Sequence, residues 1–151
     1  MEESQTIAEA AARSGVSVHT LRYYERAGLM VTTVERNHAG RRRYHEADLE
    51  WIETCTRLRA TGMPIRTIRR YAELVAAGSG NEDERLALME SHRTLVKAKL
   101  EEIEENLKLI DYKISIYRDC LAAGDAGVLW APPSPELNPA ATERGAPEAH
   151  P

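Results

Sequence analysis

The feature that most constrains this chain is its longest stretch without glycine or proline, residues 82–122, which lies between Gly80 and Gly124. Within it, apolar residues recur at alternating intervals of four and three, and only Arg93 interrupts the pattern. A heptad pattern sustained over five repeats predicts a coiled coil. The apolar positions are Leu86, Met89, Val96, Leu100, Ile103, Leu107, Ile110, Ile114, Tyr117 and Leu121.

A helix over residues 86–121 would be about 54 Å long at ~1.5 Å per residue. Because a small domain cannot cover that length with its own surface, we predict that the apolar seam pairs with a second copy of the chain. The alternative is a helix that folds back on its own domain. The flanking charges leave the orientation open. An antiparallel pair sets Lys97 against Asp111, whereas a parallel pair sets Lys99 against Glu104.

The first part of the chain predicts two short helices joined by a tight turn. Thr6-Ile7-Ala8-Glu9 is a capping box, in which the Thr hydroxyl and the Glu carboxylate satisfy free amides at a helix start. This helix is expected to end at Ser14-Gly15. Ser17 then caps a second helix from Val18 to Ala27, which Gly28 closes. Two short helices with a glycine in the turn are typical of a helix-turn-helix unit.

A small hairpin is expected next, from Val31 to Tyr44, with its turn at residues 37–40. Its outgoing side is Arg41-Arg42-Arg43-Tyr44. A run of charges is usually a solvated face, but directly after a helix-turn-helix it favours a wing that lies against a phosphate backbone. A third helix is predicted over residues 46–61 and a fourth over residues 65–77, after Pro64.

Charge and composition separate the two halves of the chain. Residues 1–77 contain 12 arginines, no lysine and 10 acidic residues, a net charge of +2, whereas the remainder has a net charge of −6. Arginine forks match phosphates and guanine edges, so the first half is the candidate nucleic-acid-binding part. Residues 131–151 contain six of the seven prolines and predict a disordered tail.

Several classes of protein are disfavoured. No run approaches the ~18 apolar residues of a membrane span, and the acidic N-terminus is unlike a secretion signal. Two cysteines are too few for a disulfide framework. We expect a cytoplasmic, mainly α-helical protein with no membrane association. Its parts are a winged helix-turn-helix domain (4–78), a long dimerisation helix (82–122) and the tail (131–151).

Several motifs together resemble the MerR family of transcription regulators. The string Leu21-Arg22-Tyr23-Tyr24-Glu25 is followed by Gly28-Leu29 and by a wing that ends in Arg42-Arg43-Tyr44. The resemblance covers residues 4–121. Within the family, the sequence is most similar to the subgroup that responds to aldehyde or nitrosative stress, through Trp51-Ile52-Glu53, Thr61-Gly62-Met63, Glu84-Arg85-Leu86, His92-Arg93 and Tyr112-Lys113-Ile114.

The resemblance implies a winged-helix domain and a homodimer joined by an antiparallel coiled coil. It also implies a two-fold operator in double-stranded DNA, between promoter elements that are too widely spaced. The dimer would bend and untwist that DNA so that RNA polymerase engages both elements, which is regulation through the deformability of DNA. No catalytic site, metal or cofactor is expected.

Site residues follow from the same resemblance. Arg22 on the recognition helix is the best candidate for a base contact, and Tyr23 is expected to bind a phosphate. Tyr24 either contacts DNA or packs inside, and Tyr44 is expected to be partly structural. Two positions depart from the family pattern, since Arg41 replaces a usual aromatic residue and His45 replaces a usual capping residue. The full set of candidate DNA-binding residues is Ser17, His19, Thr20, Arg22, Tyr23, Tyr24, Arg41, Arg42, Arg43 and Tyr44.

A sensor is harder to place. Metal-sensing relatives need a cysteine loop, but Cys120 has no second thiol near it, and about twenty proline-rich residues are too few for a drug-binding domain. The thiol-sensing subgroup carries its cysteine where this chain has Arg57. Cys55 lies two residues earlier and is the candidate sensor if Arg57 and Arg59 lower its pKa. The alternative, which we favour, is that Cys55 is an inert packing residue.

Other functional classes were weighed. An enzyme needs a convergent polar constellation, and the sequence shows no nucleophile, base or phosphate-cradling motif. A coiled-coil scaffold would explain residues 82–122 but not the arginine-rich wing. An excisionase-like protein that bends DNA without activating transcription shares the winged domain, and only promoter geometry separates it from a regulator.

Overall fold

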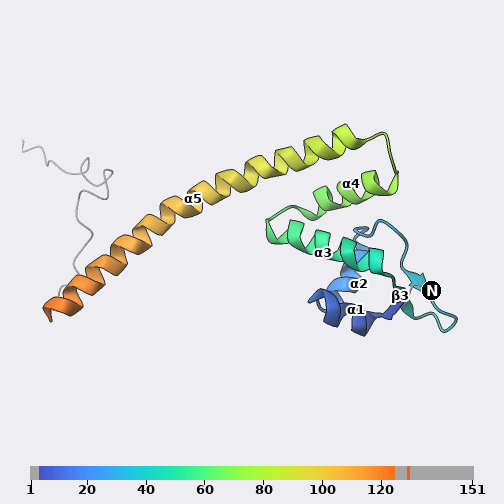
Figure 1. Ribbon diagram of the computed structural model, residues 1–151, viewed down its shortest axis with the longest axis horizontal. Coiled ribbons are helices and arrows are strands. Elements are labelled where there is room, and N and C mark those ends of the chain that lie inside the picture. Colours follow the sequence, from blue (N-terminus) through green and yellow to red (C-terminus); the bar gives the residue numbers. More distant parts are fainter. Residues whose placement is uncertain (1–3, 125–128, 130–151) are drawn as a thin grey trace, which may run out of the picture. The chain divides into compact units, whose positions relative to one another are not determined.

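The computed structural model describes residues 4–124 and 129. The chain divides into two compact units, Met1–Leu100 and Glu101–Pro151. The first unit holds every strand, helices α1 to α4 and the start of α5 (Figure 1). The elements are β1 (Gln5–Thr6), α1 (Ile7–Ser14), α2 (Val18–Arg26), β2 (Glu35–Arg36), β3 (Arg42–Tyr44), α3 (Glu46–Ala60), α4 (Ile65–Ala76) and α5 (Glu82–Ala123).

Helices α1 and α2 begin at the predicted caps. The Thr6 hydroxyl accepts from the Glu9 amide at 3.3 Å, and the Glu9 carboxylate accepts from the Thr6 amide at 2.7 Å, so the capping box is complete. Gly15 ends α1 with φ of 72°, a value that disfavours residues with a Cβ. The Ser17 hydroxyl accepts from the Thr20 amide at 3.0 Å and starts α2. The helix-turn-helix prediction is confirmed.

The predicted hairpin is present, as β2 and β3 pair antiparallel across residues 37–41. The Asn37 side-chain oxygen accepts from the amides of Ala39 and Arg41 at 3.0 and 2.9 Å, which holds the turn closed. A third strand, β1, was not predicted from the sequence. β1 pairs antiparallel with β3 to give the order β1-β3-β2, so the residues that cap α1 also join the wing.

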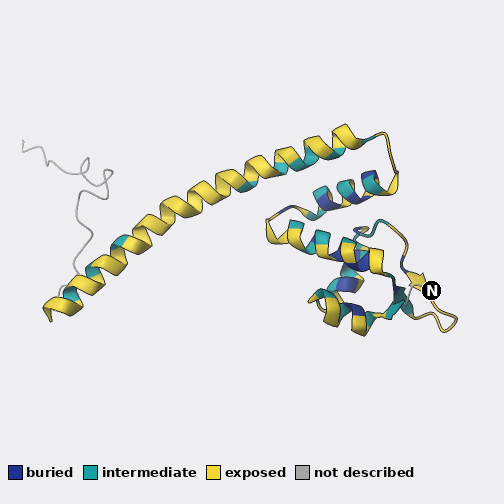
Figure 2. Ribbon diagram, in the orientation of Figure 1, coloured by how far each residue is buried: buried dark blue, intermediate teal, exposed yellow. Residues whose placement is uncertain are grey.

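Helices α3 and α4 lie within one residue of their predicted bounds. His45 departs from the usual capping residue, but its backbone amide donates to the Asp48 carboxylate at 2.8 Å. The Asp48 carboxylate also accepts from the Thr32 hydroxyl at 2.9 Å. Buried side chains from the helices and the wing form one core (Figure 2), and its largest members are Tyr24, Tyr44, Leu21, Leu29, Ile52 and Ile68.

Helix α5 begins and ends within one residue of the predicted bounds, and the burial of its apolar side chains decreases along its length. Near its start, Leu88 and Met89 pack against the core. Farther along, large apolar side chains are exposed (Figure 2). Seven of these belong to the predicted heptad seam, with exposed fractions from 41% at Ile114 to 71% at Leu121. The distal part of α5 therefore exposes the apolar side chains of the seam.

Two further sequence expectations concern the membrane and the tail. None of the described helices is long and apolar enough to cross a bilayer. The predicted disordered tail, residues 131–151, lies outside the described residues.

Candidate nucleic-acid interface

The recognition helix α2 has a buried face and an exposed one. Leu21 and Tyr24 are buried, at 1% and 2% exposure. The opposite face carries His19 and Arg22, which are exposed three residues apart. Arg26 is exposed four residues after Arg22, so it shares that face. The sequence analysis missed Arg26, although its spacing from Arg22 was a visible signal.

The start of α2 presents smaller polar groups. Ser17 is exposed and Thr20 is partly buried, and their hydroxyls lie 2.9 Å apart. The Ser17 hydroxyl also caps the helix, by accepting from the Thr20 amide. Hydroxyls in this position retain acceptor and donor capacity toward a ligand at the helix N-terminus.

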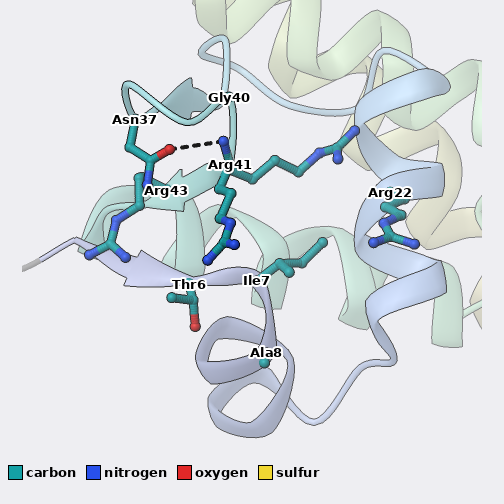
Figure 3. Close-up of a pocket in the computed structure, with 9 residues that line it drawn as sticks. Thr6, Ile7, Ala8, Arg22, Asn37, Gly40, Arg41 and Arg43 are labelled. Atoms are coloured by element: carbon teal, nitrogen blue, oxygen red, sulfur yellow. Dashed lines mark hydrogen bonds between the residues drawn. The ribbon is translucent and has the colours of Figure 1, made fainter.

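A groove of about 470 Å³ separates the recognition helix from the wing (Figure 3). Arg22 lies on one side of it, and the wing residues Arg41 and Arg43 lie on the other. The first residues of α1 complete the wall, where helix amides have no partner within the helix. The lining residues are Thr6, Ile7, Ala8, Arg22, Asn37, Gly40, Arg41, Arg42 and Arg43. Four guanidinium groups beside a helix N-terminus make a site suited to a phosphate group.

The four arginines of the groove differ in their hydrogen-bond and ion-pair partners. Arg22 and Arg41 are exposed, and neither makes an ion pair with a described residue. Arg43 donates from Nε to the Ser4 hydroxyl at 3.0 Å and from its terminal nitrogen to the Ser4 carbonyl. Arg42 is paired with the Glu25 carboxylate on α2. Arg22 and Arg41 are therefore the most available of the four to a bound anion.

For two of the candidate residues, burial favours the packing role that the sequence left open for Tyr24 and expected in part for Tyr44. Tyr24 is 2% exposed, and its hydroxyl lies 3.3 Å from the Thr56 hydroxyl. Tyr44 is 1% exposed, and this burial raises the pKa of its hydroxyl. Both rings belong to the core, so neither hydroxyl is presented to DNA, and we remove both from the set of expected contacts. Tyr23 is only partly buried and keeps a surface edge.

The environment of Cys55 supports the packing role that the sequence favoured over sensing. The side chain is fully buried, and its Sγ lies 3.8 Å from the Leu29 carbonyl oxygen. Burial raises the pKa of the Cys55 thiol to about 12. The condition for sensing, a pKa lowered by Arg57 and Arg59, is not met, because burial determines the shift and both guanidinium groups have other partners. Arg57 pairs with Glu53 at 2.6 Å, and Arg59 lies over the ring of Tyr23 at 5.7 Å. The thiol is therefore protonated near neutral pH, which favours packing over sensing.

The fold and this groove define a class. A helix-turn-helix with an exposed basic face on its second helix, flanked by an arginine-bearing wing, is the architecture of a winged helix-turn-helix DNA-binding domain.

Comparisons with known proteins agree with that class. Residues 5–74 match the model of the MerR HTH family of regulatory proteins. An uncharacterized HTH-type transcriptional regulator of Haemophilus influenzae is 36% identical over 133 residues, which span 88% of this chain and 98% of the relative. The protein belongs to the MerR family of helix-turn-helix regulators and is a DNA-binding transcriptional regulator.

Solved structures give the same result. HiNmlR, a MerR family regulator lacking the sensor domain and crystallised on promoter DNA, is 36% identical with a TM-score of 0.72. The match covers 81% of this chain and 96% of HiNmlR. A MerR family regulator from Bacillus thuringiensis is 31% identical with a TM-score of 0.67, covering 76% of this chain and all of that one. The predicted mainly helical fold, with a small winged domain and a long C-terminal helix, is confirmed.

Proposed function

We propose that this regulator binds, as a homodimer, a two-fold site in promoter DNA and distorts that DNA to control initiation by RNA polymerase in the cytoplasm. The observation that carries the proposal is the groove between α2 and the wing, where four arginines meet the start of α1. HiNmlR, which shares this fold at 36% identity, was crystallised on promoter DNA.

Each part of the first unit takes one task in this proposal. The face of α2 that carries His19 and Arg22 enters the major groove, where Arg22 reads guanine through two hydrogen bonds. Arg41 and Arg43 on the wing bind phosphates and so fix the register without specifying sequence. Ser17, Thr20 and Tyr23 contact the backbone at the edges of the helix. Residues 4–78 act as the DNA-binding domain.

Residues 82–122 supply the dimer in this proposal. The seam from Leu100 to Leu121 is apolar and exposed in the single chain, and covering such a seam is favourable by roughly 25 cal/mol per Å² of apolar surface. A second copy of the same helix offers a seam of the same spacing. We propose the antiparallel arrangement, which the resemblance to the family implies and which relates two separated DNA-binding domains by a two-fold axis.

Distortion of the DNA is the step that converts binding into regulation. A dimer with a rigid spacing between its two recognition helices binds best to DNA whose twist and bend match that spacing. The energy of deforming the promoter is then offset by phosphate contacts from both wings. No chemical reaction at the protein is involved.

One experiment tests the proposal. A pool of random duplexes is selected on the purified protein, and the recovered site is footprinted at salt concentrations between about 50 and 200 mM. We expect one two-fold site with a hypersensitive centre and an affinity that falls steeply with salt. Protection without a hypersensitive centre would argue against distortion. No enrichment of any sequence would contradict specific DNA binding and favour a scaffold.

Activation is tested separately from bending. Transcription in vitro from a promoter whose two elements flank the selected site should change when the protein is added. A site that is bent without any change in transcription would favour the excisionase-like architectural alternative.

A further inference from the structure

Glu25, in the last turn of α2, joins the recognition helix to both strands of the wing. One carboxylate oxygen accepts from Arg36 on β2 at 3.2 Å, and the other accepts from Nε of Arg42 on β3. The Glu25 and Arg42 side chains are only 25% and 23% exposed. Partial burial protects such a pair from the screening that weakens surface ion pairs.

The two strands of the wing are held differently: β3 pairs with both β1 and β2 and places Tyr44 in the core, whereas β2 pairs with β3 alone. β2 is two residues long, and both are exposed. Arg36 also donates to the Gly40 carbonyl at 3.1 Å, so it connects the Glu25 carboxylate with the turn of the wing. Glu25 therefore acts on the strand that carries Arg42 and, through Arg36, on the turn that precedes Arg41.

The same carboxylate changes the charge that the wing offers to DNA. One negative charge faces two guanidinium groups, so neither Arg36 nor Arg42 presents a full positive charge to a phosphate. Arg42 lines the groove described above, whereas Glu25 does not. From outside the groove lining, Glu25 thus offsets part of the charge of an arginine that lines the groove.

We propose that Glu25 is a positioning residue for sequence discrimination, which sets the wing against the recognition helix and withholds Arg36 and Arg42 from indiscriminate phosphate contacts. This inference rests on the proposed DNA-binding function. Without the carboxylate, the two arginines bind any duplex, and the wing no longer fixes the register at which Arg22 meets its base. Non-specific affinity rises, while affinity for the selected site does not rise with it.

The test uses the full-length protein and two duplexes, one that the wild type selects from a random pool and one scrambled version of it. E25Q removes the charge and keeps the size of the side chain. E25D keeps the charge on a shorter stem. E35Q is the matched control, because it adds the same charge to the wing while leaving both pairs of Glu25 intact; Glu35 lies 2.9 Å from His45 Nε2 and is 69% exposed.

We expect E25Q to lower the ratio of scrambled to selected dissociation constants by at least about threefold. Its salt slope on scrambled DNA should steepen by about 0.9 for each of the two arginines that gains a phosphate contact. E35Q should tighten both duplexes alike and leave the ratio unchanged. E25D should recover part of the ratio that E25Q loses.

Three results would overturn the inference. A ratio in E25Q equal to that of the wild type or of E35Q means that Glu25 does not affect discrimination. Equal weakening on both duplexes, with a lower melting temperature and no change in salt slope, means a role in folding alone. Failure of the wild type to bind either duplex overturns the proposed function itself, and the inference with it.

Discussion

The wing with its recognition helix and the distal part of α5 expose surfaces of opposite kinds, one charged and one apolar. In the first, charged groups are exposed and several are already paired with a carboxylate or a carbonyl. In the second, Ile103, Leu107 and Ile110 are about half exposed on one helical face. Arginines are well solvated without a partner, whereas exposed apolar surface is costly.

This difference predicts which of the two surfaces needs a bound partner for the protein to be stable. The seam needs a partner for stability, so its occupant should be permanent. The basic groove needs none, so its occupant can come and go with salt and sequence. A substitution in the seam should therefore disrupt the dimer. A substitution in the groove should leave the dimer intact and change only its binding to DNA.

The largest effect is expected for Ile110→Asp in the seam. An aspartate there places a charge in the apolar interface twice per dimer, and losing the buried Ile side chains alone costs roughly 1.5–3 kcal/mol per copy. We expect a monomer by sedimentation equilibrium at micromolar concentration. Binding to a two-fold DNA site should fall by more than about 100-fold, since the two half-sites are then bound independently.

Leu109→Asp is the matched control for that variant. Leu109 is also 54% exposed and lies one residue away, but it is outside the heptad seam. The Leu109→Asp variant should remain a dimer. If the two variants dissociate to the same extent, the seam assignment is wrong, and a broader apolar face of α5 makes the contact.

The second-largest effect, a loss of affinity for DNA, is expected for a substitution in the recognition helix. Arg22→Ala should weaken binding to the selected site by about 1–3 kcal/mol, because a paired contact to a guanine edge is lost. Binding to scrambled DNA should change much less, and the dimer should be unaffected. Fluorescence anisotropy on both duplexes measures this. Equal losses on the two would contradict a base-reading role.

A smaller effect is expected in the wing. Arg41→Ala should weaken binding to selected and scrambled DNA alike and make the salt slope shallower by about 0.9, the value for one lost phosphate contact. Arg43→Ala should show the same pattern and also lose the hydrogen bonds to Ser4. A sequence-dependent loss in Arg41→Ala would move this residue from the backbone to a base.

The contrast between the regions also explains what the sequence could predict. The capping box at Thr6, the turn at Gly15 and the heptad pattern of α5 are local signals, and each fixed an element to within about a residue. β1 was missed because a strand of two residues carries no periodicity, and only its pairing with β3 reveals it.

Side-chain roles in the site depend on non-local contacts and were harder to predict. Tyr23 and Tyr24 are adjacent and chemically identical, yet only the packing of α2 on α3 determines that Tyr24 is buried. Arg41, Arg42 and Arg43 look equivalent in the sequence. Their difference comes from Glu25 and Ser4, which lie 17 and 39 residues from their partners.

The smallest effect concerns the two cysteines, one in each region. Cys55 is buried with its thiol pKa raised to about 12, whereas Cys120 near the end of α5 is partly exposed. We expect Cys120 to react with iodoacetamide at pH 7.5 and Cys55 to be protected while the protein is folded. Mass spectrometry of the single variants C55S and C120S assigns each modification. Rapid labelling of Cys55 in the folded protein would contradict the packing role and favour a role as a sensor.

The raised pKa of Cys55 also gives a pH dependence with a definite sign. Above about pH 9 the unfolded thiol loses its proton while the folded thiol keeps it, so the unfolded state binds fewer protons and stability falls as pH rises. The loss should be about 1.4–2 kcal/mol by pH 10. Cys55→Ala should be less stable at pH 7 because a packed side chain is lost, but its unfolding free energy should decline less between pH 8.5 and 10. Parallel curves for the wild type and Cys55→Ala in urea denaturation would show that Cys55 titrates alike in both states.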